Sequence, residues 1–347
     1  MTGDSAHRDA GLPRTIGTGA FAATLVNGVI GGGIFAAPAA LAASVGAWAP
    51  LALLACGIAM GAMVLCCAEA GSRVPSSGGI YAQVEAAFGP FWAFLCGFTM
   101  WLSCILAAAG VAAALADAVV ALVPTGWPAH QRVVLLLGAN VGARFAGLFM
   151  GAKLVPLLLF VGIGLFAIDP GRLAPAAPVD PSAFGQAMIL SLFAFSGMET
   201  VLGASGEIAR PERTVPRALG IAMAAVLLIY LLVQAVAQGL LGAGLAGSRE
   251  PLADALAQVS PALVPVIAIG AALSRGGWLF SDAFGAPRLP FAFARDGFLP
   301  ARLGTLNRAG APAAAILLHM GLSTVLALLG EFGPLVLLSG LFIVPIY

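Results

Sequence analysis

Charged residues are scarce in this sequence of 347 residues: only 9% are Asp, Glu, Lys or Arg, whereas 61% are hydrophobic. Soluble globular proteins carry about 25% charged residues. A hydrophobic core could bury only part of these apolar side chains, and a water-exposed surface could not accommodate the rest. We therefore expect the chain to lie in a lipid bilayer. The net charge of +1 gives no indication of a nucleic-acid or acidic partner.

Patterns of metal-binding and disulfide-forming residues are also missing. The five cysteines all lie in apolar runs without a CxxC pair, and the three histidines (His7, His130 and His319) are far apart in the sequence. We predict that the cysteines are free thiols that pack as small hydrophobic residues, with no metal site and no cofactor. An intramembrane enzyme would need a converging nucleophile and base, or metal ligands, and the sequence offers neither set.

What is present is a series of apolar stretches, each long enough to cross a hydrocarbon core of about 30 Å. Ten membrane spans are predicted, at residues 17–43, 48–71, 91–123, 131–150, 153–168, 183–207, 214–242, 262–287, 311–330 and 332–347. With a cytoplasmic N-terminus, eleven arginines lie on or near the cytoplasmic side and three lie outside. This asymmetry follows the positive-inside rule, so we expect a multi-pass protein of the cytoplasmic (inner) membrane with its N-terminus in the cytoplasm.

The first apolar stretch contains three consecutive glycines, Gly31, Gly32 and Gly33, followed by Ile34. Glycine weakens a helix, and backbone groups that a broken helix frees within a membrane must face protein or a cavity. A helix that resumes at Ile34 would direct its positive N-terminal end at that cavity, which suits a carboxylate. The alternative is close helix packing through the small pair Gly28 and Gly32, and the first stretch taken alone favours it.

The sixth apolar stretch contains a second interruption, at Ser196-Gly197 in LFAFSGMETVLGASGE (192–207). Interrupted helices at matching places in two halves of a chain indicate a transporter built from inverted repeats, with its binding site near the midplane. Glu199 follows this break. Its carboxylate either caps the resumed helix or takes part in proton coupling, and one residue can do both.

Four segments then carry a resemblance to a known family. In order they are TLVNGVIGGGIFAAPAALA, CCAEAGSRVPSSGGIYAQVEAAFGP, FAFSGMETVLGASGEIARPERTVPRAL and RLPFAFARDGFLPARLGTLNRAGAP. They resemble the first helix, the exit of the second helix, the sixth helix with its following loop, and the loop after the eighth helix of the amino acid–polyamine–organocation permeases. The resemblance covers residues 15–347.

The resemblance implies an all-α integral membrane protein with a LeuT-like 5+5 inverted repeat, in which helices 1 and 6 are discontinuous. Members usually have twelve helices, so about ten are expected here and the last two are missing from the sequence. The chain then divides into a cytoplasmic tail (1–16), a first five-helix repeat (17–168) and a second five-helix repeat (183–347).

The resemblance also implies a substrate site. The backbone of Gly31–Gly33 and Ile34 would receive a carboxylate, and carbonyls of the segment from Phe193 through Phe195 and Ser196 to Gly197 would hold an α-amino group. The motifs are nearest to the arginine/agmatine antiporter branch, whose sixth-helix gate is a tryptophan; here it is Phe193, which lacks the indole N–H and argues against a specific assignment to arginine. The Gly-Gly-Trp of the branch's eighth helix, whose ring packs on the substrate, matches Gly276-Gly277-Trp278, and its proton-sensing glutamate matches Glu199.

Two intramembrane cations are further candidates. Lys153 is the single lysine among sixteen basic residues; it either extends to the lipid headgroups or, as in proton-coupled members of the family, occupies the place of a sodium ion. Burial of an ammonium favours loss of its proton, which suits proton exchange. Arg275 could bind an anionic substrate, pair with Glu199, or face a water-filled vestibule. A sodium ion takes several oxygen ligands, and Ser274 alone supplies one hydroxyl. Protons are therefore the favoured coupling ion.

We therefore expect a secondary active transporter of amino acids or related amines that works by alternating access, with proton coupling or exchange. The alternative is a non-transporting membrane amino acid sensor of the same fold. The expected partners are the small-molecule substrate, protons and the bilayer, and a homodimer is left open. Backbone atoms bind the groups that all amino acids share, so the motifs leave the identity of the substrate open.

Overall fold

The computed structural model describes residues 17–73, 79–122, 146–175, 178–197, 208, 210–307 and 312–344. These residues form α-helices joined by short 3-10 turns and loops. The helices are α2 (Thr18–Val29), α3 (Ala37–Val45), α4 (Ala49–Arg73), α5 (Gly79–Phe88), α6 (Pro90–Leu122), α8 (Ala146–Gly164), α9 (Pro181–Phe195), α11 (Pro211–Leu241), α12 (Pro251–Ala257), α13 (Val264–Gly285), α14 (Arg288–Arg295), α15 (Ala313–Leu329) and α16 (Phe332–Ile343).

The helices are apolar and several are long enough to span a bilayer. By length and composition, the described residues contain four spanning stretches, Ala37–Ala70, Pro90–Ala116, Glu212–Gly247 and Pro261–Leu279, together with shorter apolar helices. Within the first stretch the chain turns at Gly46, whose φ of 55° suits glycine, so α3 and α4 are separate helices. The predicted span at 131–150 lies mostly outside the described residues, and the number of spans stays a prediction.

Proline and aspartate residues mark where helices begin. Pro181, Pro211 and Pro251 are the first residues of α9, α11 and α12, a position where the missing N–H costs no hydrogen bond. Before α9, the carboxylate of Asp180 accepts a hydrogen bond from the N–H of Ala183, which satisfies one of the free amides at the helix start. This bond and one from the Ser182 hydroxyl lower the pKa of Asp180.

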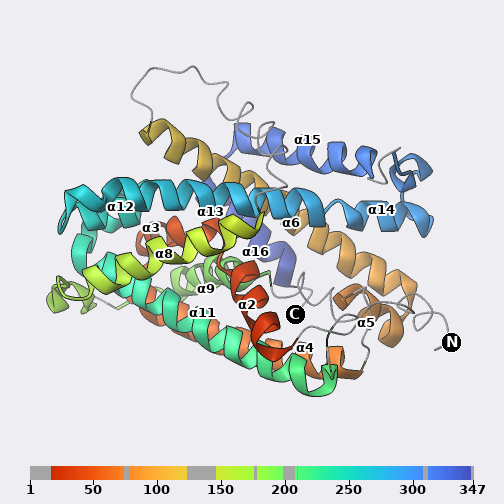
Figure 1. Ribbon diagram of the computed structural model, residues 1–347, viewed down its shortest axis with the longest axis horizontal. Helices are drawn as coiled ribbons and strands as arrows, with labels where there is room; N and C mark the ends of the chain where they lie inside the picture. The colour runs from red at the N-terminus through yellow and green to blue at the C-terminus, as the bar shows by residue number, and fades with distance from the viewer. Residues whose placement is uncertain are drawn as a thin grey trace.

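The helices pack into two groups. In the first group, α2, α3, α4, α9 and α11 share one large hydrophobic core. In the second group, α6 packs against α13, α15 and α16. Figure 1 shows α4 and α11 running alongside each other, with α13 and α15 on the opposite side of the molecule. Helix α8 contacts both α11 and α13, where the Pro156 ring fills the space beside Gly270, so α8 connects the two groups.

Candidate functional site

The first apolar stretch is broken at its glycines. Helix α2 ends at Val29, Gly31 is extended (φ −99°, ψ −161°), a 3-10 turn η1 covers Gly32–Phe35, and α3 begins at Ala37. The Gly31 N–H bonds the carbonyl of Val29 at 2.7 Å instead of continuing the helical pattern. The chain therefore has non-helical backbone well inside an apolar stretch, which must be covered by protein or line a cavity.

A second helix ends beside this break. Helix α9 ends at Phe195, Ser196 is extended, and Gly197 has a φ of +119°. A methyl group on Gly197 would lie 2.8 Å from the carbonyl oxygen of Gly28, so the ends of α2 and α9 are in close backbone contact. Residues 198–207 lie outside the described residues. They include Glu199, whose role in capping or proton coupling stays a prediction.

Two aromatic rings close over the glycines of the first break. A methyl group on Gly31 would lie 2.5 Å from Cδ1 of Trp278, and one on Gly33 would lie 2.8 Å from Cε1 of Phe193. Both rings therefore rest on backbone that only glycine can present. The structure thus brings together Gly31, Gly33, Trp278 and Phe193, four residues that the sequence predicts to form one site.

Phe193 also lines a small cavity. The cavity has a volume of about 10 Å³ and is lined by Ala37, Ala40, Leu41, Leu190, Phe193, Phe332 and Val336. That volume holds no more than about one water molecule. The Phe193 ring meets the Phe332 ring edge to face, with 6.3 Å between centroids. An amino acid enters this region only if these side chains move apart.

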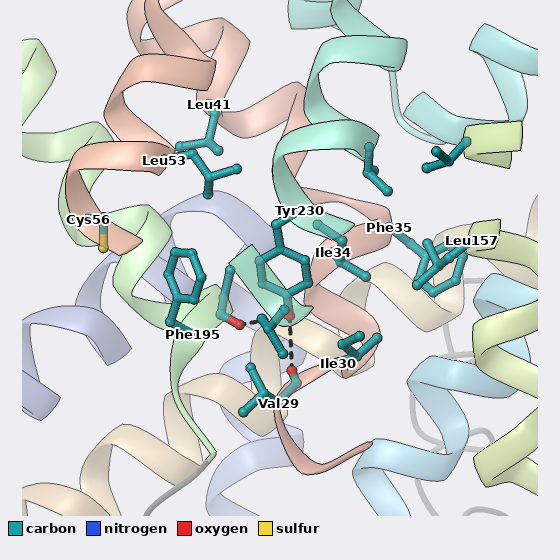
Figure 2. Close-up of a cluster of buried hydrophobic side chains, with 14 of the residues drawn as sticks. Val29, Ile30, Ile34, Phe35, Leu41, Leu53, Cys56, Leu157, Phe195 and Tyr230 are labelled. Carbon is teal, nitrogen blue, oxygen red and sulfur yellow. Dashed lines mark hydrogen bonds between the residues drawn. The ribbon is translucent and has the colours of Figure 1, made fainter. Parts of the chain in front are cut away.

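The side chain of Phe195 does not face the paired breaks. It is fully buried in the core of the first group and packs against Tyr230, with ring centroids 5.4 Å apart. Figure 2 shows it among Leu53, Cys56 and Tyr230. Ile34 is likewise a buried core residue. Because both side chains are buried in the core, only the backbone of these two residues remains available to a ligand.

Tyr230 is a residue of this site that the sequence motifs do not predict. Its hydroxyl, on α11, lies 3.1 Å from the carbonyl oxygen of Val29 and 2.8 Å from that of Ala194, as the dashed lines in Figure 2 show. These carbonyls belong to the last turns of α2 and α9, which lack helical partners. One buried hydroxyl therefore joins both helix ends. A tyrosine inside a long apolar helix is the available sequence signal, because a buried O–H requires a partner.

Lys153, on α8, also forms a hydrogen bond with the C-terminal end of α2. Its side chain is 8% exposed and its ammonium donates to the carbonyl of Asn27 at 2.6 Å, in the last turn of α2. A cation at a helix C-terminus is stabilised by the free carbonyls and the helix dipole. The side chain therefore points into the protein, and it does not extend toward the lipid headgroups.

Arg275 forms an ion pair with Glu250, a partner that is not among the three predicted from the sequence. Its guanidinium is fully buried, and Nη1 donates to the carboxylate of Glu250 at 2.8 Å and to the carbonyl of Ala114 at 3.2 Å. Glu250 is the residue just before α12. Among the described residues, Nε and Nη2 of Arg275, and the hydroxyl of the neighbouring Ser274, are buried without a hydrogen-bond partner. The ion pair ties the start of α12 to α13 and α6.

Known proteins resemble this chain over most of its length. Residues 16–346 match the model of a family described as amino acid permease. An uncharacterized transporter of Mycobacterium tuberculosis is 33% identical over 303 residues, which cover 80% of this chain and 65% of the relative. The serine/threonine exchanger of Bacillus subtilis is 29% identical over 313 residues (84% and 70%), and the methylthioribose transporter of that organism is 27% identical over 319 residues (83% and 69%). The chain thus spans just under two thirds of the first of these relatives.

Proposed function

Because this chain belongs to the amino acid permease family, we propose that it carries an amino acid or a related amine across the cytoplasmic membrane by alternating access. The observation that carries this proposal is the close contact between the break that follows α2 and the end of α9, with two aromatic rings over the glycines of the break. Free backbone groups of α2 and α9 would bind the carboxylate and the amino group. Trp278 and Phe193 would cover the side chain of the substrate.

The two helix groups give this transporter its moving parts. The breaks belong to α2 and α9 in the first group, whereas Trp278 lies on α13 in the second group. A substrate bound between Gly31 and Trp278 would therefore contact both groups at once. Rocking of one group against the other would expose the site first to one side of the membrane and then to the other, as in transporters with sites at discontinuous helices.

Lys153 would couple this movement to protons. Its ammonium holds the end of α2, beside the first break. When the ammonium loses its proton, the charge that balances the helix C-terminus is lost, and the hold on α2 weakens. Exchange of one amine for another, without net proton movement, is the other mode, and the name of the Bacillus subtilis serine/threonine exchanger gives it weight.

Ligand binding by the purified protein tests the site. Amino acids, polyamines and methylthioribose are screened for an increase in melting temperature, beginning with serine and threonine because of the named relatives. We expect at least one compound to stabilise the protein. The Trp278→Ala variant should bind it at least ten times more weakly, a loss of about 1.4 kcal/mol. The matched control is Trp92→Ala, since that side chain is 55% exposed on α6.

Two outcomes would count against the proposal. If no compound stabilises the wild-type protein, the amino acid and amine assignment fails. If Trp278→Ala and Trp92→Ala bind the compound equally well, the site does not lie at the paired breaks. Binding without flux in liposomes would instead identify the sensor alternative.

A further inference from the structure

A buried chain of hydrogen bonds joins three helices of the second group through His319. The indole Nε1 of Trp101, on α6, donates to Nδ1 of His319, on α15, at 3.2 Å. Nε2 of His319 lies 2.7 Å from Oδ2 of Asp282, on α13. His319 is fully buried, and the Asp282 and Trp101 side chains are 6% and 5% exposed. Neither His319 nor Asp282 belongs to the substrate site described above.

The chemistry of Trp101 fixes the proton positions in this geometry. An indole N–H donates and never accepts, so Nδ1 of His319 must present its lone pair. The ring proton then sits on Nε2 and points at the carboxylate of Asp282. A neutral imidazole beside an ionised carboxylate leaves the cluster with one net negative charge. In an apolar bundle an uncompensated charge is costly, and uptake of one proton removes that cost.

The proton has one open place on the imidazole, the lone pair of Nδ1. When it binds there, Nδ1 becomes a donor and can no longer accept the hydrogen bond of Trp101. The Nε2–H bond to Asp282 remains, and it becomes a charge-assisted bond between an imidazolium and a carboxylate. Protonation therefore releases α6 from α15 and strengthens the link between α15 and α13.

Other charged groups do not replace Asp282 as the partner of the ring. Helix α15 packs against α6, α13, α14 and the 3-10 turn η8 (Ala301–Gly304). The charged side chains described on these elements are Arg275 and Asp282 on α13, Arg288 and Arg295 on α14, and Arg302 on η8. Arg275 is paired with Glu250, and the three remaining arginines are exposed. Within the described side chains, Asp282 is the charged group bonded to His319.

The cluster lies one helical turn from the candidate substrate site. Asp282 follows Trp278 by four residues on α13, so both side chains lie on one face, about 6 Å apart along the helix axis. Trp278 covers Gly31 of the first break. A change in how α13 is held at Asp282 is thus transmitted through a rigid helix to the ring that covers the glycines.

We propose that Asp282 and His319 form a proton-binding site, and that proton uptake on His319 breaks its bond to Trp101 and alters the hold on α13 beside Trp278. The site differs from Lys153, which lies on α8 and holds the end of α2. The part of this inference that concerns transport rests on the proposed function; the binding of the proton does not.

Nitrogen NMR of histidine-labelled protein in lipid bilayers tests the proton site directly. The chain has three histidines, so a background with His7→Asn and His130→Asn leaves His319 as the single labelled ring. At alkaline pH we expect a proton on Nε2 alone. When the pH is lowered stepwise, both ring nitrogens should become protonated. The indole N–H signal of Trp101, identified by its absence in Trp101→Phe, should shift at the same pH.

Matched variants separate this result from a general pH effect. Asp282→Asn keeps the shape of the side chain and removes the charge, so the joint transition of His319 and Trp101 should be lost at the pH where the parent protein shows it. Trp92→Phe, an exposed tryptophan of the same helix, should leave the transition unchanged. The proposal is overturned if His319 shows no transition in the His7→Asn, His130→Asn background. It is also overturned if adding Asp282→Asn leaves the transition of His319 and Trp101 unchanged.

A transport measurement then tests the coupling. Uptake is measured at about pH 5 and about pH 8, which span the usual range of histidine. The His319→Gln and Asp282→Asn variants should keep substrate binding but lose at least half of the difference in uptake rate between these two conditions. An unchanged pH profile in both variants would overturn the coupling. If the wild-type protein moves no substrate at all, the proposed function fails, while the NMR titration still decides whether the proton site exists.

Discussion

At the scale of single residues, the two helix breaks depend on atoms that only certain side chains supply. Gly197 has a φ of +119°, and a methyl group added to it would lie only 2.8 Å from the carbonyl oxygen of Gly28. Tyr230 supplies the hydroxyl that lies between the carbonyls of Val29 and Ala194. Glycine permits the backbone path at the break, and tyrosine satisfies the polar groups that this path exposes.

Gly197→Ala is expected to destabilise the protein. A side chain at this φ costs about 1–3 kcal/mol, and the added methyl group would also meet the backbone of α2. The measurement is the free energy of unfolding of the purified protein in detergent. The matched control is Gly185→Ala on α9, the helix that ends just before Gly197, where an added methyl group meets no described atom within 4 Å. Equal stability of the two variants would show that the close contact between Gly197 and Gly28 is wrong.

Tyr230→Phe should lower the free energy of unfolding by about 1–3 kcal/mol, because it leaves a buried carbonyl without its partner. The cost falls mainly on Ala194, since the Val29 carbonyl also accepts from the Gly31 N–H. Ser191→Ala is the control: its hydroxyl bonds the carbonyl of Ala187 within the same helix. If the two variants lose the same small amount of stability, Tyr230 does not join the helix ends.

At the scale of elements, the pair Arg275–Glu250 fastens α12 to the second helix group. The guanidinium is fully buried, and it also reaches the Ala114 carbonyl on α6. A buried pair of this kind gives little net stability compared with apolar residues, but removal of one partner leaves an uncompensated buried charge. The pair therefore decides where α12 sits more than how stable the protein is.

Glu250→Gln alone should cost about 3–5 kcal/mol of unfolding free energy, because Arg275 keeps its charge without a partner. The double variant Glu250→Gln with Arg275→Met should recover most of that loss. Asp169→Asn provides the comparison, since the Asp169–Arg172 pair is 3.3 Å long but about half exposed, and it should cost less than about 1 kcal/mol. A double variant as unstable as Glu250→Gln would contradict this interpretation.

The points where α2 and α9 end could be predicted from the sequence because their causes are local. Three consecutive glycines and the Ser196-Gly197 pair weaken the helix where they stand, and α2 and α9 end next to them. The long-range partners could not be predicted. Arg275 and Glu250 are 25 residues apart, His319 and Asp282 are 37 apart, and Tyr230 lies 201 residues from Val29. Which polar groups meet at such separations depends on how the helices pack, and helical periodicity does not determine this.

At the scale of the whole molecule, the site lies between two helix groups that are packed differently. The large hydrophobic core of the first group extends to Ile267 and Ala271 of α13, whereas smaller clusters and buried polar contacts join the helices of the second group. One such contact joins Ser103 on α6 to Ser339 on α16 through reciprocal hydrogen bonds. The break between α2 and α3 meets the second group at Trp278 of α13, whose ring lies against Gly31.

The central claim is that this boundary carries substrate from one side of a membrane to the other. The most direct test is flux in proteoliposomes that contain the purified protein and a radiolabelled compound chosen by the binding screen. We predict uptake above that of empty liposomes, driven either by an imposed proton gradient or by unlabelled compound inside, and reduced at least tenfold in Trp278→Ala. Binding of the compound without uptake under either condition would contradict the account.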